Sequence, residues 1–212
     1  MGDRHAYWDA VYSKKRPTEV SWYEASPTRS LELIKRAGLP PNAPIIDIGG
    51  GASTLVDELL ARGHLDVTVV DAAQTALDIV ARRTRDLRPT GSAVHLEVAD
   101  VTAFEPRRRF SLWHDRAVFH FLTTAADQEA YRRVLLDALA DDATAVLMTF
   151  AEGGPETCSG LPVTRWSEAA LAAFFAPELS PLESGHDVHT TPWGALQAFT
   201  WVRLARRAVH MP

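Results

Sequence analysis

Three consecutive glycines, Gly49–Gly51, separate an apolar segment from a segment with helical spacing in IIDIGGGASTL. Glycine at such a junction lets the backbone approach a ligand closely, and the N–H groups that open the following helix carry a partial positive charge. The motif does not fit a phosphate-binding loop of the GxxxxGK[ST] type, because no lysine follows the glycines. A dinucleotide loop of the GxGxxG type would match Gly49 and Gly51, but Thr54 occupies its third glycine position.

Aspartates close three successive apolar segments, at Asp47, Asp71 and Asp100. A carboxylate at Asp47 would repel a diphosphate, whereas it can help to hold a cationic methionyl group. Asp71 has the position of an acid that accepts hydrogen bonds from ribose hydroxyls, which suits NAD and S-adenosylmethionine (SAM) equally. Asp100 can accept from an adenine amino group, with the backbone amide of Val101 beside it. Together the acids favour SAM, which is positively charged and carries no phosphate, over NAD.

His114 and Asp115 lie in FSLWHDRAVF, where we expect the end of a fourth strand. Ligands of open α/β sheets bind outside the carboxyl ends of the strands, so both side chains would lie beside the sulfonium of SAM. Either group could accept a proton from the methyl acceptor or orient it, and an imidazole suits base chemistry near neutral pH. The alternative interpretation is structural: His114 caps the loop and Asp115 pairs with Arg116.

A regular alternation of strands and helices must position these residues. Apolar runs predict strands within 43–49, 66–71, 93–100, 110–119 and 143–151, and helical spacing predicts helices within 26–40, 54–63, 73–87, 127–140 and 167–175. Ser26 is the expected N-cap of the first of these helices. Such alternation implies βαβ units, a parallel sheet and helices on both faces.

The last two strands, within 180–193 and 195–207, are joined by a short turn and must be antiparallel. The expected fold is therefore a doubly wound, Rossmann-like α/β fold with a seven-stranded sheet, mostly parallel, that ends in a C-terminal antiparallel hairpin.

Size and composition narrow the class of protein. The chain has 212 residues and a formal net charge of −5, which fits a single domain over 1–212 and argues against a nucleic-acid partner. No apolar run is long enough for a membrane span, and MGDRHAYWDAVYSKK lacks the apolar core of a signal peptide. We expect a cytoplasmic protein without a membrane partner, either a monomer or a weak homodimer.

The motifs IIDIGGGAS, VVD and ADV resemble those of the class I SAM-dependent methyltransferases. The segments YWDAVYSKK, EVSWYEASP and LWHDRAVFHFL are similar to those of bacterial members of this family. The first of them also resembles the start of eukaryotic lysine methyltransferases that act on citrate synthase and elongation factor. The resemblance implies SAM as the methyl donor, S-adenosylhomocysteine (SAH) as its product, and a core over 27–212 preceded by a lid segment over 1–26.

Aromatic residues are concentrated in this first segment, at Trp8, Tyr12, Trp22 and Tyr23. They precede the first strand, so the sheet does not need them, and aromatic faces attract sulfonium and ammonium groups. The resemblance implies that the segment folds over the SAM site. The alternative is ordinary apolar burial of one helical face, because Trp8 and Tyr12 are four residues apart.

A loop rich in glycine and proline, about 151–166, follows the fifth strand, where substrate loops lie in such folds. It contains Cys158, which lacks an evident base and is expected to line a pocket or the surface. His189, three residues after His186, and the nearby Trp193 are further candidates for substrate contacts. Two histidines without a clear third ligand are weak support for a metal, so we predict none.

The leading hypothesis is transfer of the SAM methyl group to a nitrogen, sulfur or oxygen nucleophile of a small molecule by in-line displacement. A protein lysine is the alternative acceptor, an NAD-dependent oxidoreductase is the alternative of another class, and a SAM-binding module without catalysis is a third possibility. The expected catalytic residues are His114 and Asp115, and the expected substrate contacts are Tyr23, Cys158, His189 and Trp193. The expected cofactor contacts are Asp47, Gly49, Gly50, Gly51, Ser53, Asp71, Ala72, Asp100, Val101 and His114, with Trp8, Tyr12 and Trp22 from the lid segment.

Overall fold

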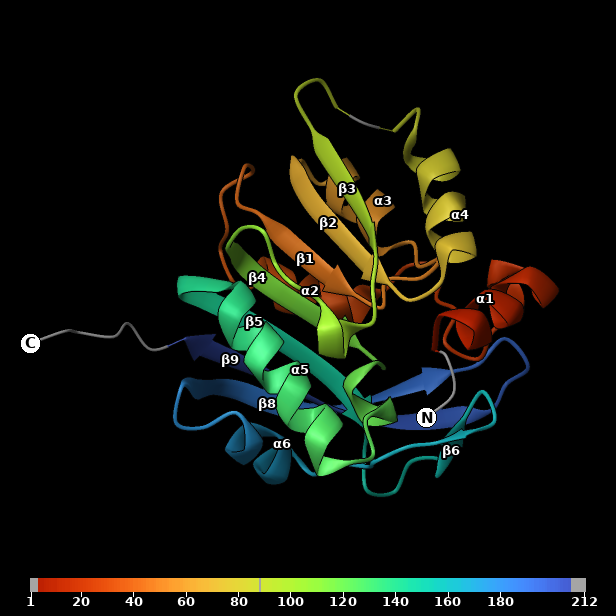
Figure 1. Cartoon of the computed structure of the whole chain (residues 1–212), viewed down its shortest axis with the longest axis vertical. Coiled ribbons are helices and arrows are strands. Elements are labelled where there is room, and N and C mark those ends of the chain that lie inside the picture. The colour runs from red at the N-terminus through yellow and green to blue at the C-terminus, as the bar shows by residue number, and fades with distance from the viewer. Residues whose placement is uncertain (1–3, 88, 207–212) are drawn as a thin grey trace, which may run out of the picture.

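The computed structural model describes residues 4–87 and 89–206 (Figure 1). Its larger sheet comprises β1 (Ile45–Ile48), β2 (Asp66–Asp71), β3 (Ala93–Val98), β4 (Phe110–Arg116), β5 (Leu139–Phe150), β8 (Leu179–Thr190) and β9 (Leu196–Arg206). The α-helices are α1 (Arg4–Lys14), α2 (Thr28–Lys35), α3 (Leu55–Ala61), α4 (Gln74–Thr84), α5 (Ala125–Ala138) and α6 (Glu168–Phe174). Short elements complete the chain: η1 (Pro17–Glu19), η2 (Val101–Ala103), η3 (Phe119–Phe121), β6 (Thr157–Cys158) and β7 (Leu161–Pro162).

The seven strands follow the order β3-β2-β1-β4-β5-β9-β8. The first five run parallel, and β9 pairs antiparallel with both β5 and β8. The predicted doubly wound sheet with a C-terminal antiparallel hairpin is therefore confirmed. The strand order reverses between β1 and β4, which is where open α/β sheets bind their ligands.

Alternating side chains of each parallel strand enter two different cores. Ile45 packs with apolar residues of α2, α3 and α4, whereas Ile46 packs with α5 and α6 on the other face. In Figure 1, α5 and α6 lie in front of the sheet and α2 and α3 behind it. Because both faces are covered, the central strands are buried, which explains their continuous apolar runs.

The start of α2 differs from its prediction. Pro27 is the residue before the first helical turn, and among the described residues no side chain caps this helix. Instead, the backbone oxygen of Ser26 accepts a hydrogen bond from the Thr28 amide at 2.9 Å. The predicted Ser26 cap is therefore wrong, because a tight backbone turn satisfies the amide that the hydroxyl was expected to bind.

Two elements outside the sheet position the site. Helix α1 lies beside the carboxyl ends of β1 and β2 in Figure 1, and the small hairpin of β6 and β7 belongs to the segment that follows β5. No helix in the described part of the chain has the length and apolar character needed to cross a membrane.

Candidate functional site

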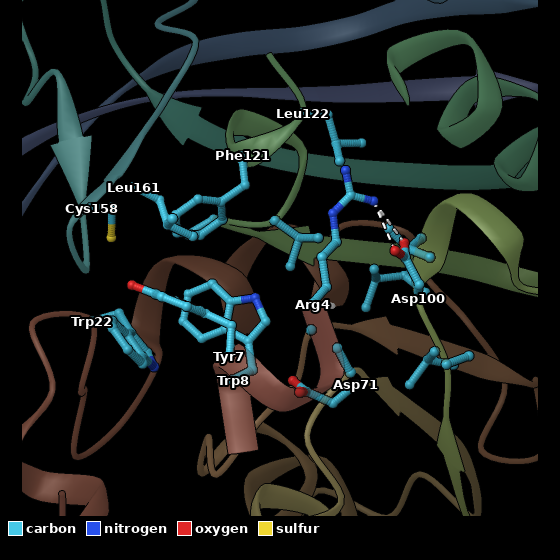
Figure 2. Close-up of a pocket in the computed structure, with 18 of the residues that line it drawn as sticks. Arg4, Tyr7, Trp8, Trp22, Asp71, Asp100, Phe121, Leu122, Cys158 and Leu161 are labelled. Carbon is cyan, nitrogen blue, oxygen red and sulfur yellow. Dashed lines mark hydrogen bonds and ion pairs between the residues drawn. The ribbon is translucent and has the colours of Figure 1, made fainter. Parts of the chain in front are cut away.

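A cavity of about 520 Å³, here called the main cavity, lies between α1, the ends of β1 to β4 and the β6–β7 hairpin (Figure 2). Its volume is within the range of about 300–1,000 Å³ that is typical of small-molecule sites. Its lining comprises Arg4, Ala6, Tyr7, Trp8, Tyr12, Trp22, Ile48, Gly49, Val70, Asp71, Ala72, Ala99, Asp100, Val101, Arg116, Ala117, Val118, Phe121, Leu122, Thr123, Cys158, Leu161 and Pro162.

The glycine bend needs glycine for two separate reasons. Gly49 and Gly51 have φ angles of +61° and +50°, which other residues rarely adopt. A Cβ atom on Gly49 would lie 2.0 Å from Cγ2 of Val118, and one on Gly51 would lie 2.2 Å from the Tyr12 hydroxyl oxygen. The bend is therefore enclosed by the turn after β4 and by α1 as well as by its own sheet.

The Asp71 carboxylate holds two backbone amides at the end of β2. Its Oδ2 accepts from Gly51 N and its Oδ1 from Ala73 N, each at 2.8 Å. Burial of the side chain raises the pKa of Asp71 to about 6, against the opposing effect of these two hydrogen bonds. Asp71 thus fixes the glycine bend relative to the start of α4 while it lines the main cavity.

Asp100, which also lines the main cavity, is bound by α1. The Arg4 guanidinium donates to its Oδ1 at 3.0 Å and to its Oδ2 at 2.8 Å, and Thr102 N donates to Oδ1 at 2.9 Å. Burial acts to raise the pKa of Asp100, but hydrogen bonds from Thr102 and Arg4 outweigh it and hold the pKa below its usual value. Asp100 is therefore an ionised acceptor beside the cavity.

His114 lies behind the glycine bend rather than in the main cavity. Register places it opposite Asp47 in the β1–β4 pair, and its Nδ1 lies 2.7 Å from Asp47 Oδ1. Its Nε2 lies 2.9 Å from Ser30 Oγ on α2. Both ring nitrogens are thus engaged within the protein, and His114 lines only a second cavity of about 40 Å³, here called the small cavity.

Asp115 points to the other face of the sheet and lines neither cavity. Its carboxylate accepts from Val118 N at 2.9 Å, Phe119 N at 3.1 Å and the Tyr131 hydroxyl at 2.5 Å. Burial raises the pKa of Asp115 to about 6. The predicted pairing of Asp115 with Arg116 is wrong, because these three donors from the η3 turn and α5 surround the carboxylate instead.

The predicted cofactor residues divide between the two cavities. Gly49, Asp71, Ala72, Asp100, Val101, Trp8, Tyr12 and Trp22 line the main cavity. Asp47, Gly50, Ser53 and His114 line the small cavity, which shares Gly49, Tyr12, Trp22, Ile48 and Arg116 with the main one. Gly51 contributes its amide to Asp71. The glycine bend therefore forms the wall between the two spaces.

Residues of the lid segment form one aromatic wall of the main cavity. The ring centroid of Trp8 lies 6.0 Å from that of Trp22 and 5.1 Å from that of Phe121, in edge-to-face contacts. Asp9 accepts from Thr75 N at 2.9 Å, which attaches α1 to the start of α4. Helix α1 and Trp22 thus contribute one wall of the main cavity, held by polar contacts as well as by aromatic rings.

Among the predicted substrate contacts, only Cys158 lines the main cavity. Tyr23 lines the small cavity. His189 is buried, with Nε2 2.7 Å from the Ser21 oxygen. Trp193, in the turn between β8 and β9, is 61% exposed. His189 and Trp193 lie outside both cavities, because β8 is the edge strand farthest from β1 on its side of the sheet.

Sequence reasoning missed several lining residues, among them Arg4, Tyr7, Arg116, Phe121 and Leu161. Arg116 had a usable signal, because it is the last residue of β4 and so reaches the edge where ligands bind. Arg4 and Leu161 had none, because no local pattern tells which distant segment covers a sheet edge. Within the described residues, no group of three histidine, cysteine or acidic side chains could hold a metal ion.

Comparisons with known proteins point to a methyltransferase. Residues 45–141 match the family described as "Methyltransferase domain". The N-methyltransferase NodS from Bradyrhizobium japonicum WM9, solved with SAH, superposes with a TM-score of 0.74 at 15% identity, over 97% of this chain and 100% of that chain. A 1,6-didemethyltoxoflavin-N1-methyltransferase from Burkholderia thailandensis, solved with 1,6-didemethyltoxoflavin and SAH, has a TM-score of 0.69 at 18% identity, over 97% and 84% of the two chains.

EEF1A lysine methyltransferase 2 of Mus musculus is 26% identical in an alignment 145 residues long, which covers 63% of this chain and 57% of that protein. The match therefore spans little more than half of the relative's length. Residues 45–141, slightly less than half of the chain, match a methyltransferase domain, and the solved structures share its α/β fold. Both findings support a class I SAM-dependent methyltransferase rather than the NAD-dependent oxidoreductase considered from the sequence.

Proposed function

We propose that this protein transfers the methyl group of SAM to a nitrogen, sulfur or oxygen nucleophile of a small molecule that binds in the main cavity. The observation that carries this proposal is the two-ended shape of the cavity in Figure 2. Asp71 and Asp100 lie at one end, and Trp22, Cys158 and Leu161 lie at the other. One end thus suits the adenosine of the donor and the other an apolar acceptor.

The residues present fit SAM. The glycine bend leaves no room for side chains, so backbone would lie against the donor, and no phosphate-binding lysine accompanies it. The Asp100 carboxylate is ionised and suits an amino-group donor such as adenine, and Asp71 lies where ribose hydroxyls are bound in related folds. We further propose that residues 1–26 form the lid of a single domain whose core is 27–212.

SAM, when bound, supplies a methyl group on a positively charged sulfur, and the chain supplies position and shielding. Asp71 holds the glycine bend in place through Gly51 N. Trp8, Trp22 and Phe121 exclude water and present ring faces that attract a cation. Orientation of two reactants in a dry site is a large part of the catalysis available to such a transfer. His114 and Asp115 act here as positioning residues that hold the bend and the η3 turn.

A protein lysine is the second candidate acceptor, because the mouse relative named above is a lysine methyltransferase. The arrangement of α1 weighs against it. Tyr7 on α1 donates a hydrogen bond to the Ser159 oxygen beside the β6–β7 hairpin, so the lid segment and this hairpin meet over the apolar end of the cavity. A lysine on a folded protein would have to pass this contact, whereas a small molecule could be enclosed by it.

Thermal unfolding with separate additions of SAM, SAH and NAD tests the proposed donor. A ligand at 100 times its Kd stabilises the folded state by about 2.7 kcal/mol. We expect SAM and SAH to raise the Tm and NAD to leave it unchanged. Asp71→Ala should reduce the shift with SAH, whereas Asp78→Ala, at a position on α4 outside both cavities, should retain it. Stabilisation by NAD alone would refute the proposal.

The acceptor is then addressed with labelled SAM in two parallel assays, one on a fractionated metabolite extract and one on the proteins of the same extract. The small-molecule proposal requires label in the metabolite fraction. Label on lysines of a protein, with none in metabolites, would assign the second candidate instead.

A further inference from the structure

The apolar end of the main cavity contains one cationic side chain, Arg116, which is only 11% exposed. The walls around it are aromatic or apolar, with Tyr7, Trp8 and Phe121 in the middle of Figure 2 and Trp22, Cys158 and Leu161 at its far end. Such walls favour a flat, apolar acceptor. A charged group among them is costly to bury, so its presence calls for a role.

Arg116 is anchored by two residues of the lid segment and by one ring of β9. Its Nη1 donates to the Trp22 oxygen at 3.1 Å, its Nη2 lies 3.2 Å from Glu24 Oε1, and its guanidinium lies 5.0 Å from the ring centroid of Phe199. Arg116 lines both the main and the small cavity, whereas Glu24 lines only the small one of the two. A guanidinium carries more N–H donors than these two contacts use, so donors remain for an anionic group on the cavity side.

The described residues that line the main cavity offer no available base. Asp71 and Asp100 are at the far end and are held by backbone amides and by Arg4. The Tyr7 hydroxyl already donates to Ser159 O. Burial raises the pKa of both Tyr12 and Cys158, which keeps each of them protonated near neutral pH. No histidine, lysine or glutamate occurs in this described lining.

An acceptor in this site must therefore arrive with its nucleophilic electron pair already free. Alkyl ammonium groups and phenols hold their protons up to a pH of about 10, whereas thiols ionise near a pH of about 8.5. Aryl amines and ring nitrogens have a free electron pair at neutral pH, but they carry no charge for a guanidinium to stabilise. Aryl thiols are more acidic still, because the ring delocalises the charge. A buried guanidinium favours an anion and disfavours an ammonium group next to it. Carboxylates are ionised as well, but two strongly hydrated oxygens suit an apolar chamber poorly.

Within the proposed methyltransferase function, on which this inference rests, we propose that the acceptor is a small aryl or heteroaryl thiol, bound as its thiolate beside Arg116. The thiol loses its proton to solvent before or during binding. An electron pair of the thiolate sulfur then forms the new sulfur–methyl bond as the bond from the methyl group to the donor sulfur breaks and leaves its pair on that sulfur. A neutral thioether and SAH, with its sulfur now uncharged, result, so no base is needed at the moment of transfer.

The first test uses the donor-free wild-type protein. Binding of thiophenol, phenol, aniline and benzoate at pH 8 is followed by quenching of tryptophan fluorescence, since Trp8 and Trp22 line the cavity. Thiophenol should bind at least ten times more tightly than phenol or aniline. The ultraviolet absorbance of the thiolate should show that bound thiophenol titrates at a lower pH than free thiophenol. Equal binding of the neutral compounds, or tighter binding of benzoate, would overturn the inference.

The second test replaces Arg116. Arg116→Met should abolish the lowered titration of bound thiophenol, and Arg116→Lys should retain part of it. Arg108→Met is the matched control, because Arg108 also pairs with a carboxylate, Asp66, and lies 5.0 Å from the centroid of Phe110, yet it is outside the main cavity. An unchanged titration in folded Arg116→Met would contradict the proposal. If that variant does not fold, the binding of the four compounds to the wild-type protein remains the test.

A measurement of SAH binding distinguishes the thiol acceptor from the methyltransferase proposal on which it rests. Thermal shift by SAH without thiophenol binding would leave the methyltransferase proposal standing and refute the thiol acceptor. Absence of any SAH shift would refute the methyltransferase proposal itself. With SAM added, mass spectrometry should detect the methyl thioether of thiophenol.

Discussion

The guanidinium of Arg4, on α1, binds both carboxylate oxygens of Asp100, which is the acid expected to accept from adenine. A second contact joins Arg4 to Asp127 on α5 at 3.0 Å. The side chains of Arg4 and Asp100 are about one-fifth exposed, so this pairing is more shielded from solvent than a surface ion pair. The proposed lid is thus attached to the same carboxylate that the proposed donor would use.

Loss of this attachment should loosen the lid. Arg4→Met is expected to raise amide hydrogen exchange across 4–14 and to accelerate SAH dissociation about three- to thirtyfold, because a charge-assisted, two-point contact contributes about 1–2 kcal/mol. Stopped-flow dissociation and exchange mass spectrometry measure the two effects. Arg62→Met, which removes an exposed pair with Glu58, should change neither. Equal protection of α1 in both variants would show that the rings alone hold the lid.

The close approach of α1 to the glycine bend predicts a coupling between Gly51 and Tyr12. Gly51→Ala should cost about 1–3 kcal/mol more than Gly38→Ala, because both positions have positive φ but only Gly51 has an atom within 4 Å of the added Cβ. Urea unfolding of Gly51→Ala, Tyr12→Phe and the double variant forms the test. Tyr12→Phe should recover part of the excess cost, since the nearest remaining atom is Cζ at 3.1 Å. Additive costs would show that no such contact exists in solution.

Asp71 should make the protein less stable as the pH rises between about 4 and 6. The unfolded side chain releases its proton near pH 4, whereas burial raises the folded pKa to about 6. The folded state therefore binds more protons in this window, so the free energy of unfolding falls with rising pH, by about 2–3 kcal/mol from this group. Asp71→Asn cannot titrate, and the advantage of wild type over it should shrink from pH 4 to pH 7. A constant difference would indicate a normal pKa for Asp71.

Asp115 is expected to stabilise the turn after β4 rather than to exchange protons with a substrate. An asparagine has one acceptor oxygen for three donors, so Asp115→Asn should lower the free energy of unfolding by about 2–4 kcal/mol. Asp141→Asn, at an exposed position, should have little effect. The pH dependence of turnover in the folded variant should keep its wild-type shape. Loss of one limb of that profile would support the catalytic role first predicted for Asp115.

His114 should behave as a partner of a buried carboxylate. His114→Ala leaves Asp47 without its 2.7 Å contact, which should destabilise the fold by about 2–4 kcal/mol. His95→Ala, at a half-exposed side chain, is the control. The structural and the catalytic role of His114 are distinguished by measuring unfolding at several pH values and by comparing kcat at the same folded fraction. Normal stability with greatly reduced kcat would favour catalysis by His114.

Local sequence patterns were sufficient to predict the sheet and the acidic residues at the donor end of the main cavity. Apolar runs and helical spacing depend on neighbouring residues, and the strand order of the observed sheet agrees with the predicted class of fold. Asp71 and Asp100 could be grouped from the sequence, because parallel strands end at one edge of a sheet. His114 and Asp115 were expected beside the donor, but neither lines the main cavity. Both precede Arg116, the last residue of β4. Because neighbouring side chains of a strand point to opposite faces, the two residues also face different sides of the sheet.

By itself, then, the sequence determined an α/β sheet with a glycine bend and acidic strand ends, because those features follow from periodicity along the chain. Only the tertiary structure decided which side chains face the acceptor. Tyr7 meets Ser159 across 152 positions of sequence, and Arg116 projects between the lid and the sheet. Such contacts arise from how separate segments pack over the sheet edge, and no spacing within one segment encodes them.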